Sequence, residues 1–336
     1  MPSHRLIHSD LAKRLAAAPK APQWPSFNGI STFAGITSSG KVMVWYDASL
    51  GAQCKMNALD LLAAADGVVA ANDAIFGTTG GPVSVIVFAL GGATDGTGGA
   101  DHMGCDYQTG QNIEVCASFG QSDRVIALFE AELSEDGMGH NLCGQSTGEA
   151  LSRWAAMQVS NNALSDFATG PTWDQDGRPN FVDSVDPTDQ NPDSTGCGMV
   201  FISWLMSIPP HPTLATIAQA MVKLGDGGTL AQLYSQMTGD LMANAWSKFI
   251  IAVNALANGI QSDDPFGATQ PQPQPGPTPP PPPPPGPTPP PTPPPTPGPG
   301  VSGLMWAILA SNALLAGVDA GETASEIKSD VDSIPT

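Results

Sequence analysis

Four glutamates lie close enough in the sequence to act together. Glu130, Glu132 and Glu135 fall within residues 122–136, where an apolar stripe predicts an amphipathic helix. Glu132 and Glu135 are three residues apart and are therefore neighbours on one helical face. Glu149 lies at the beginning of the next predicted helix, so packing of the two helices would bring it to the same place. Carboxylates grouped in this way favour binding of a hard divalent cation, or acid/base catalysis on water or on a sugar.

Two histidines lie in segments that can border the same place. His102 sits in a glycine-rich stretch, residues 91–110, between Asp101 and Asp106, and His140 lies in the loop that joins the two glutamate helices. The glycines predict a loop with unusual backbone dihedrals. We expect Asp101, His102, Asp106 and His140 to contact substrate, with His102 also a candidate metal ligand. The alternative for His102 is a hydrogen bond that only stabilises the loop.

A second group of carboxylates lies in a long irregular segment, residues 164–192. Its beginning has the D-x-D-G form found in calcium loops, because Asp174 and Asp176 precede Gly177. Calcium takes six to eight oxygen ligands and tolerates irregular loops. The candidate calcium ligands are Asp174, Asp176, Asp183, Asp186 and Asp189. The segment lacks the bidentate glutamate of a complete EF-hand, so a solvated acidic loop remains the alternative.

The elements that must position these residues follow a sheet-first order. Runs of β-branched and apolar residues predict strands over residues 41–46, 82–90 and 113–119, with the middle one buried on both faces. Helical spacing of apolar residues predicts helices over residues 54–76, 122–136, 147–159, 197–208, 212–224, 229–238 and 243–258. Strands near the N-terminus followed by a helical C-terminal half indicate the α+β class, with an N-terminal mixed sheet and a site helix.

Proline content sets the domain organisation. The chain has 336 residues and 34 prolines, and 20 of those prolines fall within residues 271–300. We predict a mobile N-terminal arm over residues 1–25, a globular domain over 26–262, a Pro-rich linker over 263–300 with polyproline II structure in residues 271–300, and a terminal helix with an acidic tail over 301–336. The uncharged run from Val301 to Val318 is short for a membrane anchor and carries polar residues, so docking on its own domain or on a partner chain is preferred over membrane association.

Charge and cysteine content limit the partners and the compartment. The formal net charge is −19, which repels phosphate backbones and disfavours nucleic-acid binding. The acidity, the scarcity of lysine and the proline-threonine linker suggest a secreted or cell-surface protein, although residues 1–25 hold no apolar core of a secretory signal. Five cysteines leave at least one unpaired; disulfides or buried thiols both fit, and the sequence does not fix the pairing.

The succession of motifs resembles the gluzincin, or thermolysin-like, metallopeptidase superfamily. VMVWYDASLG and ALDLLAAADGVVAANDAIFG match its strand and its alanine-rich helix, VSVIVFAL its buried strand, and GEALSRW (residues 148–154) the motif that carries its third zinc ligand. GCGMVFISWLMS, TLAQLYSQMTGD and AWSKFIIAV match its later helices. The resemblance covers about residues 40–255. It implies a zincin-like fold, a peptide or polymeric substrate and a divalent cation, zinc or calcium, as cofactor.

The sequence departs from that superfamily at its HExxH motif. Residues 129–135 read FEAELSE, which puts Glu132 at the motif's glutamate and Ala131 and Glu135 at its two histidines. The resemblance implies that Glu132 is the general base and Glu149 the third metal ligand, with Glu135 in an altered ligand position. Alanine cannot bind metal, so a His-His-Glu zinc site is absent.

Three functions remain open from the sequence. The first is a divergent hydrolase of peptide bonds that uses Glu132 as general base. The second is a non-catalytic pseudo-peptidase, an extracellular binding or surface module tethered by the proline-rich stalk. The third is a carbohydrate-active hydrolase that uses Glu132 and Glu149 as its carboxylate pair.

Overall fold

A computed structural model describes residues 19–108 and 111–268 of the chain. Within these residues the protein combines a five-stranded mixed sheet with eight α-helices, which confirms the predicted α+β class. The run from Val301 to Val318, most of the predicted linker and residues 1–18 lie outside the described residues. None of the described helices is both long enough and apolar enough to span a membrane.

The sheet has a parallel centre and an antiparallel strand at each edge. Its strands are β1 (Ser31–Ile36), β2 (Val42–Asp47), β3 (Val83–Phe88), β4 (Ala100–His102) and β5 (Asn112–Cys116). They lie in the order β1-β2-β3-β5-β4; β2, β3 and β5 are parallel, and β1 and β4 run antiparallel to their neighbours. All six residues of β3 are buried, as its continuous apolar run predicts. Strands β1 and β4 were not predicted; β4 has only three residues and no apolar run.

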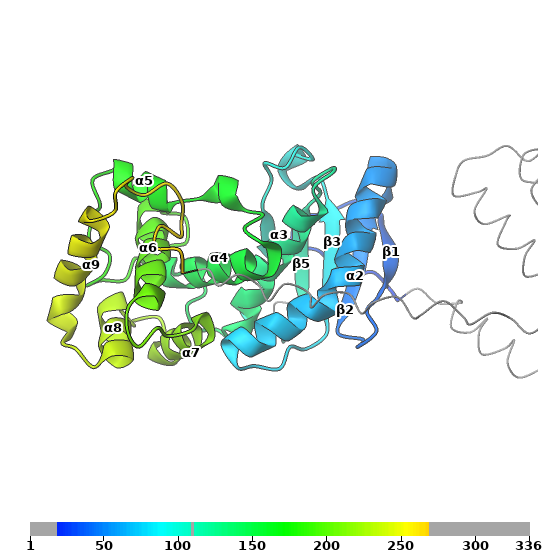
Figure 1. Ribbon diagram of the computed structural model, residues 1–336. Coiled ribbons are helices and arrows are strands. Elements are labelled where there is room, and N and C mark those ends of the chain that lie inside the picture. The colour runs from blue at the N-terminus through cyan, green and yellow to red at the C-terminus, as the bar shows by residue number, and fades with distance from the viewer. Residues whose placement is uncertain (1–18, 109–110, 269–336) are drawn as a thin grey trace, which may run out of the picture. The chain divides into compact units, whose positions relative to one another are not determined.

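Two helices cover one face of the sheet, and six more follow along the chain. They are α2 (Gly51–Phe76), α3 (Ser122–Gly137), α4 (Ser146–Ser160), α5 (Gly170–Gln175), α6 (Pro192–Ser207), α7 (Leu214–Leu224), α8 (Leu230–Thr238) and α9 (Ala245–Asn254). Four short 3₁₀ turns lie at Ala48–Leu50, Leu90–Gly92, Ser165–Phe167 and Met242–Asn244. In Figure 1 the sheet and α2 lie on one side, α6, α8 and α9 on the other, and α3 and α4 between them.

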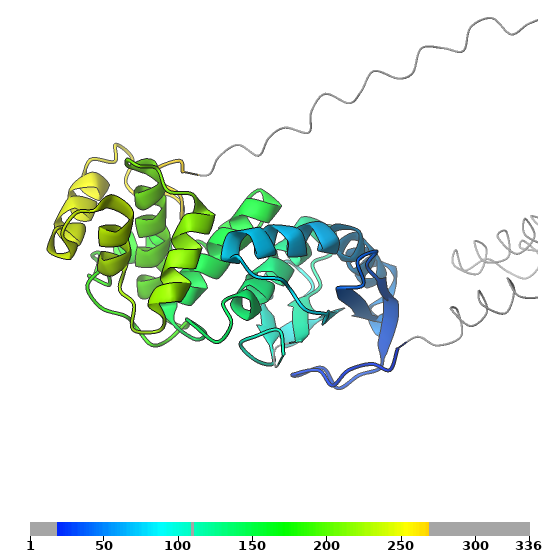
Figure 2. The same cartoon turned by 90° about the horizontal axis from the view of Figure 1, so that it is seen from below.

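Separate apolar cores hold the two ends of this arrangement. One core joins α2 and α3 to the sheet through residues such as Val44, Val85 and Phe129. Alternate residues of the same strands point to the opposite face, where Trp45 and Ile86 form a smaller cluster. A third, larger core joins α4 to α6, α7, α8 and α9 (Figure 2). Helices α3 and α4 therefore lie where the sheet and the helical half meet.

Both predicted domain boundaries carry packing contacts. Trp24, at the end of the predicted N-terminal arm, is buried against Trp45 at a ring-centroid distance of 6.4 Å. The adjoining Ser26 donates from its backbone N–H and its hydroxyl to the buried carboxylate of Glu114. At the other end, Asp263 is buried and accepts hydrogen bonds from the backbone of residues 169 and 170. Residues outside the predicted range of 26–262 thus help to hold the domain.

One predicted helix begins earlier than its apolar spacing indicates. The helix predicted over residues 197–208 starts at Pro192, because Asn191 caps it by accepting from the Asp193 N–H and proline occupies the first turn. The segment predicted to be irregular, residues 164–192, also contains α5. Cap and proline signals, which mark helix starts, therefore outweighed the polar composition there.

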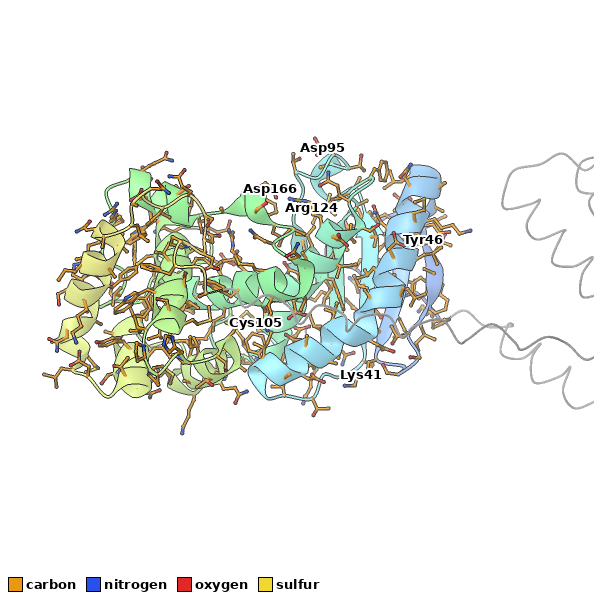
Figure 3. The ribbon with its side chains drawn as sticks, viewed as in Figure 1. Lys41, Tyr46, Asp95, Cys105, Arg124 and Asp166 are labelled. Atoms are coloured by element: carbon orange, nitrogen blue, oxygen red, sulfur yellow. A yellow bond between two sulfur atoms is a disulfide. The ribbon has the colours of Figure 1, made fainter. Side chains whose placement is uncertain are left out.

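An ion pair ties the beginning of α3 to the turn after α4. Arg124 on α3 is buried and pairs with Asp166, and its guanidinium lies 4.5 Å from the centre of the Phe167 ring (Figure 3). Phe167 is also one of the residues that line the cavity described below. The pair therefore fixes one wall of that cavity to the site helix.

Candidate functional site

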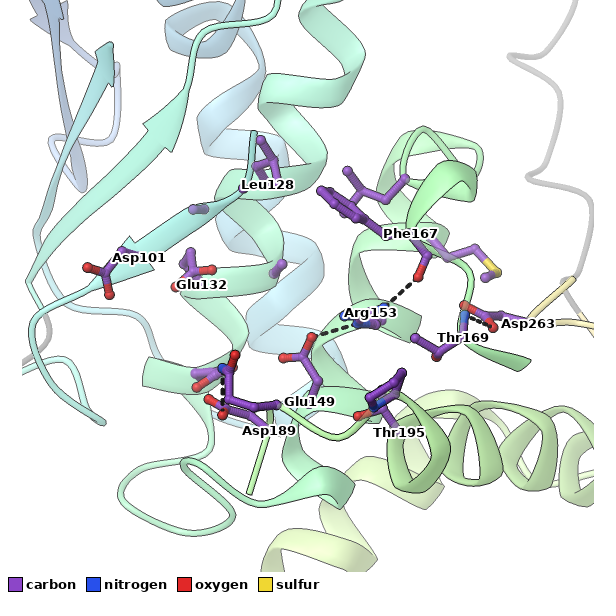
Figure 4. A pocket seen from close by; sticks show the side chains of 18 of the residues that line it. Asp101, Leu128, Glu132, Glu149, Arg153, Phe167, Thr169, Asp189, Thr195 and Asp263 are labelled. Carbon is purple, nitrogen blue, oxygen red and sulfur yellow. Dashed lines mark hydrogen bonds and ion pairs between the residues drawn. The ribbon is translucent and has the colours of Figure 1, made fainter. Parts of the chain in front are cut away.

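A cavity of about 410 Å³ lies where α3, α4 and strand β4 meet. Six carboxylates line it: Asp101, Glu132, Glu135, Glu149, Asp189 and Asp263. Its cationic groups are Arg153 and, when protonated, His102. Figure 4 shows Glu132 on α3 and Glu149 on α4 directed toward the same space. The structure thus brings together the glutamates that the sequence analysis singled out, apart from Glu130.

The helix spacing explains why Glu130 does not line the cavity. Residues 132 and 135 share a face of α3, whereas residue 130 lies on the opposite side and is fully buried in the core. Neither carboxyl oxygen of Glu130 has a hydrogen-bond partner among the described residues. Burial, together with the nearby charge of Asp73, raises the pKa of Glu130 well above its usual value.

His102 reaches the glutamates from the sheet edge. Strand β4 pairs with β5 so that His102 is opposite Ile113, and its imidazole extends to α3. The His102 Nε2 atom lies 3.0 Å from Glu135 Oε2 and 3.9 Å from Glu132 Oε2. Burial by itself lowers the pKa of His102, but the hydrogen bond to Glu135 and the charges of both glutamates outweigh it and raise the pKa to about 9. The structure thus places His102 in the cavity beside Glu132 and Glu135, and its metal or substrate role stays a prediction.

The two catalytic candidates sit in an environment that disfavours negative charge. Burial raises the pKa of Glu132 well above its usual value, and the neighbouring Glu135 adds to the effect. Burial also raises the pKa of Glu149, although Arg153 opposes that shift. Only 16% of the Glu132 side chain is exposed, so solvent screens these charges weakly. A bound cation would relieve the mutual repulsion of these carboxylates.

Arg153 holds the proposed third ligand in place. The Arg153 Nε–H donates to Glu149 Oε1 at 2.6 Å, one helical turn away, and its Nη1 donates to the carbonyl of Phe167 at 2.6 Å. Gly148 allows α4 to begin close to the preceding loop, because a Cβ at that position would collide with the Leu142 carbonyl. Sequence analysis missed Arg153, although its i+4 spacing from Glu149 was a readable signal.

A disulfide lies beside the cavity. Cys105 is bonded to Cys143, whereas Cys54, Cys116 and Cys197 are buried thiols. The sequence left the pairing open. The sulfur of Cys143 belongs to the one group of three potential ligands found among the described residues, with His102 and Glu135; its ligand atoms lie within 4.8 Å of one another.

Two of the predicted substrate contacts lie outside the cavity lining. Asp106 and His140 form an ion pair with each other, and the His140 N–H donates to the Cys105 carbonyl at 2.6 Å. Asp101 and His102, in contrast, both line the cavity. The chain bends after β4, so residues only four positions apart face different surroundings.

The calcium candidates are spread among separate partners. Asp174 pairs with Arg178 at 2.5 Å, Asp183 accepts from Asn180 at 2.8 Å, and Asp186 accepts from Asn191 at 2.7 Å. Within residues 19–108 and 111–268 these aspartates form no group of three close ligand atoms. Asp189 is the member that lines the cavity.

The donor atoms at His102 and Glu135 fit a zinc-type ion. Ligands bound tetrahedrally at about 2.0–2.1 Å lie roughly 3.4 Å apart, close to the 3.0 Å between Nε2 and Oε2. The other ring nitrogen of His102, Nδ1, is buried and has no hydrogen-bond partner within the described part of the chain. His102 and Glu135 could therefore hold two ligand positions of such an ion, and Glu149 and Cys143 are the candidates for the third.

Comparison with known proteins adds no further assignment. No model of a protein family matches the chain, and no curated protein matches it. The roles of the cavity residues are accordingly inferred from their chemistry and surroundings.

Proposed function

We propose that this protein is a cation-dependent hydrolase of peptide bonds with a divergent zincin-like arrangement. His102 and Glu135 hold the cation, Glu149 is its third ligand, and Glu132 is the general base. The zincin-like fold and a secreted or cell-surface location belong to the same proposal.

The position of His102 carries the proposal. The site helix lacks histidine, since Ala131 and Glu135 stand where the superfamily has its two ligands. An imidazole from the edge strand lies 3.0 Å from Glu135 and 3.9 Å from Glu132, which compensates for that loss with a different residue. Support also comes from the order of elements, in which a sheet leads to a site helix and then to a second helix with a glutamate in its first turn.

Glu132 is suited to proton transfer. When bound, the cation would polarise the substrate carbonyl and lower the pKa of water. Glu132 accepts a proton from the attacking water and returns it to the leaving amine, and a raised pKa brings a carboxyl closer to the ideal for that exchange near neutrality. His102 and Glu135 orient the cation, and Arg153 limits the movement of Glu149.

The cavity lining suggests how a peptide is accommodated. Leu128, Met157, Leu164 and Phe167 provide apolar contacts in the wall, and the six carboxylates belong to the same lining. An apolar side chain of the substrate fits against the first group, and a basic one would be attracted by the second. Phe167 is the one aromatic residue in the described lining, which offers little stacking surface for the alternative carbohydrate substrate.

The experiment that tests the proposal measures metal content and hydrolysis together. The oxidised protein is loaded with Zn²⁺, dialysed and analysed for bound metal, and its cleavage of an unfolded protein substrate is followed with and without chelator. We expect one ion per chain and chelator-sensitive cleavage in the wild type, and loss of both in His102→Ala and Glu135→Gln. His211→Ala is the matched control, because His211 is exposed and does not line the cavity. Absence of both stoichiometric metal and cleavage would reject the hydrolase.

One observation favours a second candidate, the non-catalytic binding module. Arg153 neutralises Glu149 at 2.6 Å, and Ala131 provides no ligand, so the cavity is partly balanced without any cation. In that case wild type and His102→Ala would bind no metal and would bind a cationic peptide equally, and a chain lacking residues 269–336 would lose only its tethering.

A further inference from the structure

Two side chains beside His102 and Glu135 can act as the third ligand, and each is held by another bond. The carboxylate of Glu149 accepts from Arg153. The sulfur of Cys143 is bonded to Cys105. Of the two, only Cys143 belongs to the group whose ligand atoms lie within 4.8 Å of one another. The state of the disulfide therefore decides which third ligand the site has.

We propose that the Cys105–Cys143 disulfide is a redox control on the cation site, and that reduction makes Cys143 a thiolate ligand beside His102 and Glu135. The inference rests on the proposed cation site at those two residues, and it adds a regulated ligand that the sequence pattern does not contain. The oxidised protein relies on Glu149 and binds the cation less tightly than the reduced protein does. The reduced protein has a His-Glu-Cys set and binds it tightly.

The chemistry of the step is thiol–disulfide exchange. A dithiol reductant donates two electrons and two protons to the disulfide, which becomes two cysteine thiols while the reductant becomes a disulfide. Cys143 then loses its proton to solvent as its thiolate binds the cation. Both cysteines are partly exposed, so a reductant in solution can reach the bond.

The Cys143 sulfur needs to move only a short distance to become a ligand. Donor atoms around a tetrahedral zinc ion lie roughly 3.4–3.6 Å apart, so the Cys143 sulfur has to approach by about 1 Å from a separation of up to 4.8 Å. Release from Cys105 frees its side-chain torsion for that change. Three protein ligands leave one coordination position for water, which is the arrangement of catalytic zinc sites. Glu132 remains beside that position, 3.9 Å from the His102 nitrogen.

A thiolate also changes the preference among cations. Sulfur ligands select zinc, cobalt and similar metals, whereas calcium prefers oxygen. Reduction should therefore increase affinity for Zn²⁺ and Co²⁺ but not for Ca²⁺. The three remaining cysteines are buried away from the group, so they do not supply this ligand.

The test uses two single variants that both lose the disulfide. Cys105→Ser leaves the Cys143 thiol, and Cys143→Ser leaves the Cys105 thiol, so any general destabilisation is shared. Each protein is titrated with Co²⁺, and the thiolate-to-cobalt charge-transfer band in the near ultraviolet is recorded with the dissociation constant.

We expect the band in reduced wild type and in Cys105→Ser without any reductant, with a dissociation constant at least about ten-fold below that of oxidised wild type. Cys143→Ser should show no band in either redox state. The inference is overturned if Cys105→Ser shows no band, or if Cys143→Ser shows it as strongly. Failure of the proposed function looks different, because His102→Ala would then leave cobalt binding of the oxidised protein unchanged.

Discussion

The carboxylates around the cavity and those in the acidic loops differ in how their charge is balanced. In the acidic segment, residues 164–192, Asp174 pairs with Arg178 at 2.5 Å, Asp183 accepts from Asn180 at 2.8 Å and Asp186 accepts from Asn191 at 2.7 Å. At the cavity six carboxylates share Arg153 and His102. Burial at the cavity also weakens solvent screening, whereas the loop aspartates Asp183 and Asp186 are in contact with water.

This difference in charge balance indicates which carboxylates of an acidic protein are candidates for function. Paired loop carboxylates need nothing further, and they account for part of the net charge of −19. Unbalanced, buried carboxylates are unfavourable unless a cation or a proton compensates them. The proposed chemistry therefore belongs to Glu132, Glu135 and Glu149, whereas Asp183 and Asp186 are in contact with solvent.

The largest expected difference between the cavity carboxylates and the loop aspartates is in catalysis, and it concerns Glu132. We expect Glu132→Gln to lower kcat for peptide cleavage by about 10²–10⁴-fold, because an amide cannot act as the general base. Metal content should stay at the wild-type level, since His102 and Glu135 are untouched. The matched control in the loop, Asp183→Asn, should leave kcat unchanged. Equal losses of kcat in the two variants would show that Glu132 has no catalytic role beyond that of a loop aspartate.

A second prediction concerns buried carboxylates with and without partners. Glu130→Met should stabilise the protein at pH 8 by about 1–3 kcal/mol, because it removes a buried group that has no hydrogen-bond partner. Glu114→Met should destabilise it by a similar amount, about 1.5–3 kcal/mol, because Glu114 accepts from Ser26 and Phe27.

The effect of Glu130 has a definite pH dependence. Its folded-state pKa is raised well above the ordinary value of 4.5, so its favourable contribution is complete at lower pH and is lost as pH rises through the folded-state pKa. The gain from Glu130→Met should thus be larger in urea unfolding at pH 8 than at pH 5. A gain that is independent of pH would show that Glu130 is not a source of unbalanced charge.

A smaller effect is expected from Arg153. Arg153→Gln frees Glu149 for the cation, and we expect oxidised protein to bind Zn²⁺ a few-fold more tightly, which is under about 1.4 kcal/mol. Zinc competition against a chelating dye measures the constant. The double variant Arg153→Gln/Glu149→Gln should lose the gain; if it keeps the gain, Glu149 is not a ligand.

The smallest effect is expected in the acidic segment, residues 164–192. Asp174→Asn removes an ion pair with Arg178 whose partners are both partly exposed, so urea unfolding should change by no more than about 1 kcal/mol. The bound-metal content should be unchanged. Loss of metal in this variant would show that the acidic segment contributes to cation binding.

Much of the site helix could be predicted because the relevant signals are local. Apolar spacing located the segment over residues 122–136, against an observed α3 of Ser122–Gly137, and three-residue spacing put Glu132 and Glu135 on one face. The same spacing puts Glu130 on another face of the helix, but only the tertiary structure shows that this face is buried in the core. Strand β4 could not be predicted, because its three residues carry no alternating pattern and depend on pairing with β5.

The amino-acid sequence by itself determined the α+β order, the glutamate pair at residues 132 and 135, and the absence of histidine from residues 122–137. Each depends on residue identity or on spacing within one element. The tertiary structure alone decided that His102 lies beside Glu135, 33 residues away, and that Cys105 pairs with Cys143, 38 residues away. Such contacts depend on strand register and on packing between elements, and no local periodicity encodes them.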